Sequence, residues 1–127
     1  KALEIINYFN PKVWVLENPE TGLLKKQPFM SGVPYSVCSY CKYGYTFKKQ
    51  TALWSSMKNE LDSVLQVCRK DCGAVLDGRH VSSVEYSTAG KMRGAIPIPL
   101  LQTIFSKAEE VLCREPEPEP ELMLMAT

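Results

Sequence analysis

The chain has 127 residues, 45% of them hydrophobic and 23% charged, which is enough for one ordinary globular core. It contains no run of about twenty apolar residues, which excludes a membrane-spanning helix. Five cysteines, an odd number, favour a reducing compartment over a disulfide framework, so we expect a nuclear or cytoplasmic setting.

Charge is distributed unevenly behind the formal net charge of +1. Residues 1–113 hold fourteen Lys and Arg against ten Asp and Glu, whereas residues 114–127 hold one Arg and four Glu. A modestly basic body with an acidic tail is compatible with nucleic-acid binding. The same balance is also typical of an ordinary solvated surface.

The first predicted elements are a helix and a strand. Residues 2–9 carry apolar side chains at helical spacing, and residues 13–16 form a β-favouring apolar run that predicts a strand covered on both faces. Pro19 prevents the strand from extending further. Glu17 would then lie just beyond a buried strand, where open α/β sheets bind ligands and where burial helps a carboxyl group to hold or deliver a proton. The alternative is a loop glutamate, because Glu-Asn-Pro is also ordinary turn chemistry.

The middle of the chain alternates between short elements. Residues 22–30 predict a short helix or structured loop, and residues 35–43 and 52–55 predict a strand, turn and strand. Apolar residues at helical spacing over 58–67 favour a short amphipathic helix, with a loop as the alternative.

The strongest helix signal lies near the C-terminus. Residues 99–113 carry a continuous apolar stripe, and Pro99 suits a first helical turn. The alternating Glu and Pro that follow can neither form a helix nor bury a core, so we expect residues 114–127 to be a disordered tail.

Four cysteines and the single histidine have spacings that recur in metal sites. Cys38 and Cys41 stand in a Cys-x-x-Cys pair, and Cys68 and Cys72 follow in the next segment. A zinc site can be drawn from these four thiols, or with His80 in place of one of them. Because Cys41 lies in an aromatic segment typical of a packed strand, we expect free thiols here rather than zinc.

Three blocks follow one another in an informative order. They read PKVWVLENP over 11–19, YGYTFKKQTALW over 43–54 and GAIPIPLL over 94–101. In this order they resemble consecutive motifs of the DNA cytosine-5 methyltransferases: a Glu-Asn tripeptide on a strand end, an aromatic-Gly turn before a basic strand, and a segment that leads into a C-terminal helix. The resemblance covers residues 1–112.

The resemblance implies an α/β fold, the C-terminal part of a Rossmann-like S-adenosylmethionine-dependent methyltransferase with an incomplete sheet. Residues 1–113 would be a partial catalytic domain, with a shortened target-recognition region over 55–93 and the tail over 114–127. DNA would be the partner and S-adenosylmethionine the cofactor.

The chain also departs from the family pattern. It contains neither the Pro-Cys nucleophile block nor the glycine-rich methyl-donor turn, so we expect an upstream half of the same enzyme to supply both, and this chain alone to be inactive. Lys49 and Thr51 stand where the family carries Arg-x-Arg, and lysine cannot make the bidentate contact of arginine. Arg93-Gly94-Ala95 stands where Gly-Asn-Ala is usual.

The resemblance assigns roles to particular residues. Glu17 would bond the N3 edge and the exocyclic amine of a flipped cytosine, and Asn18 would fix the turn that aims it. The implied catalytic residues are Glu17, Asn18, Lys49 and Thr51, and the implied DNA-binding residues are Lys48, Lys49 and Arg79.

Two readings from other classes stay open. One is a non-catalytic DNA-binding piece, which the missing nucleophile favours. The other is a zinc-stapled interaction module, which the cysteine spacing favours.

Overall fold

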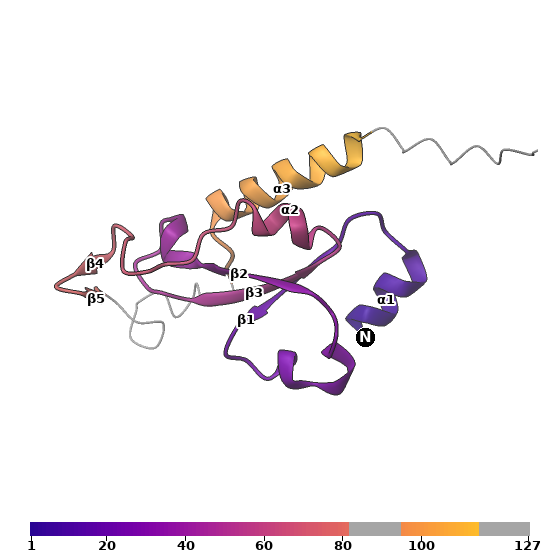
Figure 1. The fold of residues 1–127 in the computed structure, drawn as a ribbon, viewed down its shortest axis with the longest axis horizontal. Helices are drawn as coiled ribbons and strands as arrows, with labels where there is room; N and C mark the ends of the chain where they lie inside the picture. Colours follow the sequence, from indigo (N-terminus) through magenta and orange to yellow (C-terminus); the bar gives the residue numbers. More distant parts are fainter. Residues whose placement is uncertain (82–94, 115–127) are drawn as a thin grey trace, which may run out of the picture.

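The computed structural model describes residues 1–81 and 95–114, and a three-stranded antiparallel sheet lies at its centre (Figure 1). The strands are β1 (Val15–Pro19), β2 (Tyr35–Ser39) and β3 (Gln50–Ser55), in the order β1-β3-β2. The central strand β3 is buried over Thr51 to Ser55. This small sheet with packed helices confirms the α/β class, whereas the larger Rossmann-like sheet stays a prediction.

The strand that carries Glu17 differs from the sequence prediction. It begins at Val15 and ends at Pro19, and it is an edge strand rather than one covered on both faces. The prediction was wrong because the apolar run was taken for a central strand, whereas antiparallel pairing with β3 leaves β1 at the rim with Val15 exposed. Glu17 therefore lies inside the strand, opposite Leu53, and not beyond its end.

Helices and turns lie on both sides of the sheet (Figure 1). One side is covered by α2 (Lys58–Asp62) and α3 (Ile98–Cys113). The other side carries α1 (Ala2–Phe9) and two 3-10 turns, η1 (Leu24–Lys26) and η2 (Pro28–Met30).

The central strand feeds a separate core on each side, because successive strand residues point to opposite faces. Leu53 joins the core beneath α2 and α3, whereas Ala52 and Trp54 join the core beneath η2. The buried members of the first core are Cys38, Tyr40, Tyr43, Leu53, Met57, Leu61, Leu100 and Ile104. Those of the second are Met30, Ala52 and Trp54.

Most other predicted elements are confirmed. The helix over 2–9 is α1, and the C-terminal helix begins one residue before Pro99. The strand predicted over 35–43 is shorter than expected, because β2 ends at Ser39 and the next residues form the 3-10 turn η3 (Tyr40–Tyr43). The helix predicted over 58–67 is shorter than expected and ends at Asp62.

A two-stranded hairpin stands at one end of the molecule (Figure 1). It consists of β4 (Val75–Leu76) and β5 (Arg79–His80). The two residues between the strands, Asp77 and Gly78, have φ of 52° and 75°, which is the left-handed pair that a two-residue hairpin turn requires.

Several sequence predictions fall outside the described residues. These are Arg93 and Gly94 at the start of the third motif block, residues 82–93 of the predicted recognition region, and the tail over 115–127. Within the ranges described, no helix has the length and apolar character needed to cross a membrane.

Candidate functional site

The Glu17 carboxylate is held by two side chains from other elements. Tyr40 donates its hydroxyl to Glu17 Oε1 at 3.2 Å, and Lys49 Nζ lies 3.8 Å from the same oxygen. Lys49 also lies over the Tyr40 ring, 5.0 Å from its centroid, where the ring face attracts a cation. These three residues, which we call the Glu17 cluster, form a compact charged and aromatic group.

Strand register brings the cluster together. Thr51 pairs with both Pro19 and Cys38. The end of β1, the start of β3 and the end of β2 therefore meet at the same end of the sheet. Lys49 immediately precedes β3, and Tyr40 immediately follows β2. Residues far apart in the sequence therefore converge on Glu17.

Tyr40 is a suitable permanent donor for this carboxylate. Burial raises the pKa of Tyr40, and the nearby negative charge of Glu17 raises it further. The phenol therefore keeps its proton and continues to donate to Glu17. Tyr40 was not among the predicted site residues, because it fell inside the strand predicted over 35–43, and only the end of β2 at Ser39 places it at the end of a strand.

Glu17 also lines an apolar groove between β1 and α3. The groove has a volume of about 350 Å³, and its other walls include Leu53, Ile104 and Phe105. The side chain of Glu17 is about a quarter exposed, at 24%. The carboxylate is thus oriented by protein donors and still reachable from the groove.

The remaining predicted catalytic residues are placed differently. Thr51 is fully buried at the same sheet edge, and its hydroxyl donates to the Lys49 carbonyl at 3.2 Å. Asn18 lies on the opposite face of β1 from Glu17. A Cβ at Gly22 would lie 2.7 Å from Asn18 Oδ1, so the Asn18 side chain packs tightly into the turn that follows β1.

Of the predicted DNA-binding residues, Lys48 and Arg79 are exposed at this same end, whereas the side chain of Lys49 is only 13% exposed. Lys48 is adjacent to the Glu17 cluster in the chain, and Arg79 is on the hairpin strand β5. The structure gives neither of them a contact with Glu17.

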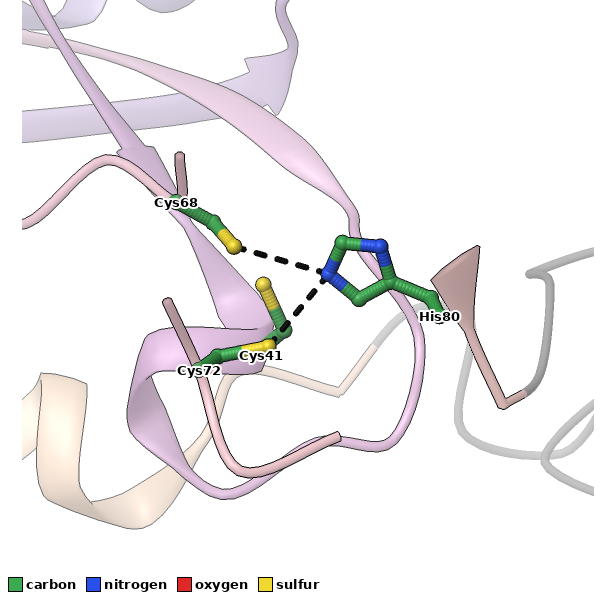
Figure 2. Close-up of side chains that lie close together, drawn as sticks. All are labelled: Cys41, Cys68, Cys72 and His80. Carbon is green, nitrogen blue, oxygen red and sulfur yellow. Dashed lines mark hydrogen bonds between the residues drawn. The ribbon is translucent and has the colours of Figure 1, made fainter. Parts of the chain in front are cut away.

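A second group lies beside η3 and consists of Cys41, Cys68, Cys72 and His80, which we call the Cys3His cluster (Figure 2). Their ligand atoms all lie within 4.8 Å of one another. His80 Nε2 is 3.5 Å from Cys68 Sγ and 3.4 Å from Cys72 Sγ. Figure 2 shows the side chains converging from separate segments of the chain.

This cluster corrects the expectation of free thiols without a metal. Three thiols and one imidazole in mutual contact are a donor set that suits zinc, so that expectation is not supported. Of the sets that the sequence allowed, the structure brings together the one in which His80 replaces Cys38. Cys38 belongs instead to the core beneath α2 and α3, where burial raises its pKa to about 12.

The thiols within the cluster have different electrostatic surroundings. Burial alone would raise the pKa of Cys68, but hydrogen bonds from Cys41 and His80 lower it to about 6. Burial raises the pKa of Cys41 to about 12. Cys68 therefore becomes a thiolate more readily than Cys41 does.

The chain is similar to the probable DNA (cytosine-5)-methyltransferase of Frog virus 3 (isolate Goorha), with 37% identity over 59 residues. The match covers 46% of this chain and 27% of that protein, so the chain spans about a quarter of the length of the relative it matches. No family model matches the chain, and no solved structure matches it. This similarity confirms the resemblance read from the motifs: the chain contains a region that resembles DNA cytosine-5 methyltransferases.

Proposed function

We propose that this chain is the C-terminal portion of a DNA cytosine-5 methyltransferase with a Rossmann-like fold, and that Glu17 binds the target cytosine. The observation that carries the proposal is the Glu17 carboxylate, fixed by Tyr40 and Lys49 and open to a groove. The similarity to the viral protein supports the reaction class.

Cytosine methylation needs the base outside the helix, because the ring atoms that react are inaccessible inside the duplex stack. A cysteine thiolate from the upstream half would add to C6 of the flipped base. S-adenosylmethionine would supply the methyl group for C5, held by residues outside this chain, which has no glycine-rich turn of that kind. The C5 proton is then lost and the thiolate leaves, which restores the enzyme.

In this scheme Glu17 recognises the edge of the ring. One oxygen of its carboxyl group accepts from the exocyclic amine, and a proton held between the other oxygen and N3 neutralises the negative charge that develops on the ring as the thiolate adds. Tyr40 and Lys49 restrict the carboxylate to one orientation. Asn18 supports the turn after β1, and Thr51 supports the backbone of Lys49.

The basic residues at this end would bind the DNA backbone. Lys48 and Arg79 are exposed, and exposed cations bind phosphates in a salt-dependent way that carries no sequence information. Together with the Glu17 cluster they would form one DNA-facing edge.

The test is methyl transfer from labelled S-adenosylmethionine to mixed-sequence duplex DNA, with a longer protein that includes the upstream residues. We expect activity in the long protein and none in this chain alone. Glu17→Gln should lower the rate by a factor of at least about 100, since a transition-state contact is lost. Retained activity in Glu17→Gln would refute the assignment of this residue.

Glu20→Gln is the matched control, because Glu20 lies just after β1 and its carboxylate is paired with Lys25 at 2.6 Å. It should leave the rate within about twofold of the unmodified protein. An inactive long protein that still binds DNA would replace the methyltransferase proposal with the non-catalytic DNA-binding reading.

A further inference from the structure

We propose that Cys41, Cys68, Cys72 and His80 bind one Zn²⁺ as a closed structural site. This inference does not depend on the methyltransferase proposal, since it rests on the geometry of the Cys3His cluster alone. Three sulfurs and one imidazole nitrogen complete a tetrahedral shell, which leaves no position for water or substrate. Soft thiolate ligands with this count favour zinc over magnesium or calcium.

The distances within the cluster match a zinc shell. Zn–S bonds of about 2.3 Å and Zn–N bonds of about 2.05 Å, set at tetrahedral angles, place sulfur and nitrogen about 3.6 Å apart. His80 Nε2 lies 3.5 Å from Cys68 Sγ and 3.4 Å from Cys72 Sγ. The third sulfur, Cys41 Sγ, lies within 4.8 Å of each of the other three ligand atoms (Figure 2).

Hydrogen bonding alone accounts poorly for this convergence. An imidazole nitrogen has one lone pair or one proton, so His80 Nε2 makes one strong hydrogen bond at a time. Two thiols nevertheless lie at almost equal distances from it. A cation at the centre of the group explains why all four atoms point inward.

The surrounding backbone holds the ligands in place. Cys68 donates its backbone N–H to Ser39 Oγ at 2.9 Å, and Ser39 donates its own N–H to the Gln66 carbonyl at 2.9 Å. The Cys68 sulfur receives the backbone N–H of Lys70, and Lys70 has a left-handed φ of 64°. N–H groups directed at a ligand sulfur are the outer contacts that orient metal sites.

A metal would also supply the stability that this part of the chain lacks. The strands β4 and β5 have two residues each, and the side chains of Leu76 and Val81 are 67% and 58% exposed. An isolated two-stranded hairpin is marginal in water, and it has little core of its own here. Zinc would tie the hairpin and the preceding loop to η3, as metals do in small domains.

The site would act on the Glu17 cluster through η3. Cys41 directly follows Tyr40, and both belong to η3. His80 directly follows Arg79 on β5. Zinc would therefore fix two residues relative to the end of the sheet where β2 ends and β3 begins. One is Tyr40, which donates to Glu17, and the other is the exposed Arg79.

The first experiment is the zinc content of the untagged 127-residue chain, purified without chelator and measured by mass spectrometry of the metal. We expect one zinc per chain. A content below about a fifth of a zinc per chain, in protein given zinc during folding, would overturn the proposal. Because this measurement needs no variant, it decides the question even if every substituted protein fails to fold.

Variants identify the ligands. Cys72→Ser and His80→Ala should each reduce the zinc content at least fivefold, and they should abolish the visible absorption of tetrahedral thiolate-bound cobalt when Co²⁺ replaces zinc. Cys113→Ser is the matched control, because Cys113 is exposed at the end of α3, and it should keep the full content. Loss of zinc in Cys38→Ala with retention in His80→Ala would overturn the ligand set.

Thiol state separates a metal from a disulfide. In the zinc-loaded chain we expect the thiols of Cys41, Cys68 and Cys72 to be protected from alkylation until a chelator is added. The proposal would be contradicted if the protein is purified in a reducing buffer and mass spectrometry still finds a disulfide between any two of the cluster cysteines.

Discussion

Among single residues, Tyr40 has the clearest role in positioning Glu17. Its ring is fully buried, and its hydroxyl donates to Glu17 Oε1. Removing the hydroxyl alone therefore removes this hydrogen bond and leaves the packing of the ring nearly unchanged. Tyr40→Phe should lower kcat of the long protein about tenfold, the equivalent of about 1.4 kcal/mol in the transition state. KM should change much less, because the contact orients the carboxylate rather than binding DNA.

The same substitution should cost about 1.5–3 kcal/mol in the free energy of unfolding, the usual value of a hydrogen bond to a charged group. Urea denaturation of the 127-residue chain measures this cost. Tyr45→Phe is the control, because the Tyr45 hydroxyl donates instead to the Ala95 carbonyl at 3.1 Å and makes no contact with Glu17. If both variants lower kcat equally, Tyr40 has no special role.

Among the elements, α2 is connected to β2 by a hydrogen bond between Ser36 and Asp62 whose contribution to stability depends on pH. Ser36 donates its hydroxyl to Asp62 Oδ1 at 2.6 Å, and Lys58 forms an ion pair with the same carboxylate. The Lys58 hydrogen bond, followed by that from Ser36, holds the pKa of Asp62 below its ordinary value. A depressed pKa means that the folded state favours the charged carboxylate.

The stabilisation from Asp62 should therefore be complete well above the ordinary aspartate pKa near 4 and should disappear as the pH falls through the lower folded value. Asp62→Asn should lower the urea midpoint at pH 7 and have a smaller effect at pH 3. Both proteins share every other acid-sensitive group, so their difference at each pH isolates Asp62. Glu109→Gln, exposed on α3, should have no effect at either pH, and an Asp62→Asn effect that is equal at both would contradict the linkage.

The sequence predicted the elements whose periodicity is local. The helices α1 and α3 follow from apolar spacing within one segment, and both are confirmed. The strand β1 was misplaced because a short apolar run does not distinguish a central strand from an edge strand. Only pairing with β3 determines that β1 extends to Pro19.

The candidate site depended on contacts that spacing does not encode. Glu17 was identified from its motif, whereas its partner Tyr40 is brought near by strand register. The Cys-x-x-Cys spacing suggested Cys38 as a ligand, but Cys38 lies on β2 in the core, whereas Cys41 lies on η3 in the Cys3His cluster. His80 enters the cluster because a tight hairpin turns β5 back toward Cys72.

In the molecule as a whole, the functional candidates gather at one end of the sheet. The Glu17 cluster, Lys48 and the hairpin with Arg79 all lie where β2 ends and β3 begins. Lys12 precedes β1 and lies toward the opposite end, because Val15 pairs with Ser55 at the end of β3. The molecule therefore has one end where the proposed DNA contacts gather and an opposite end that provides an internal comparison.

We expect Lys48→Ala with Arg79→Ala to weaken binding of the zinc-loaded 127-residue chain to duplex DNA. If each residue contacts one phosphate, the plot of log affinity against log salt concentration should become less steep by about 1.8. Fluorescence anisotropy of labelled mixed-sequence DNA across a salt series measures both quantities. Lys12→Ala, which removes an exposed cation at the opposite end, should change the slope by less than about 0.5. If Lys12→Ala reduces the slope as much per charge as the double variant does, then binding responds only to net charge, and this end of the sheet is not the DNA-binding edge.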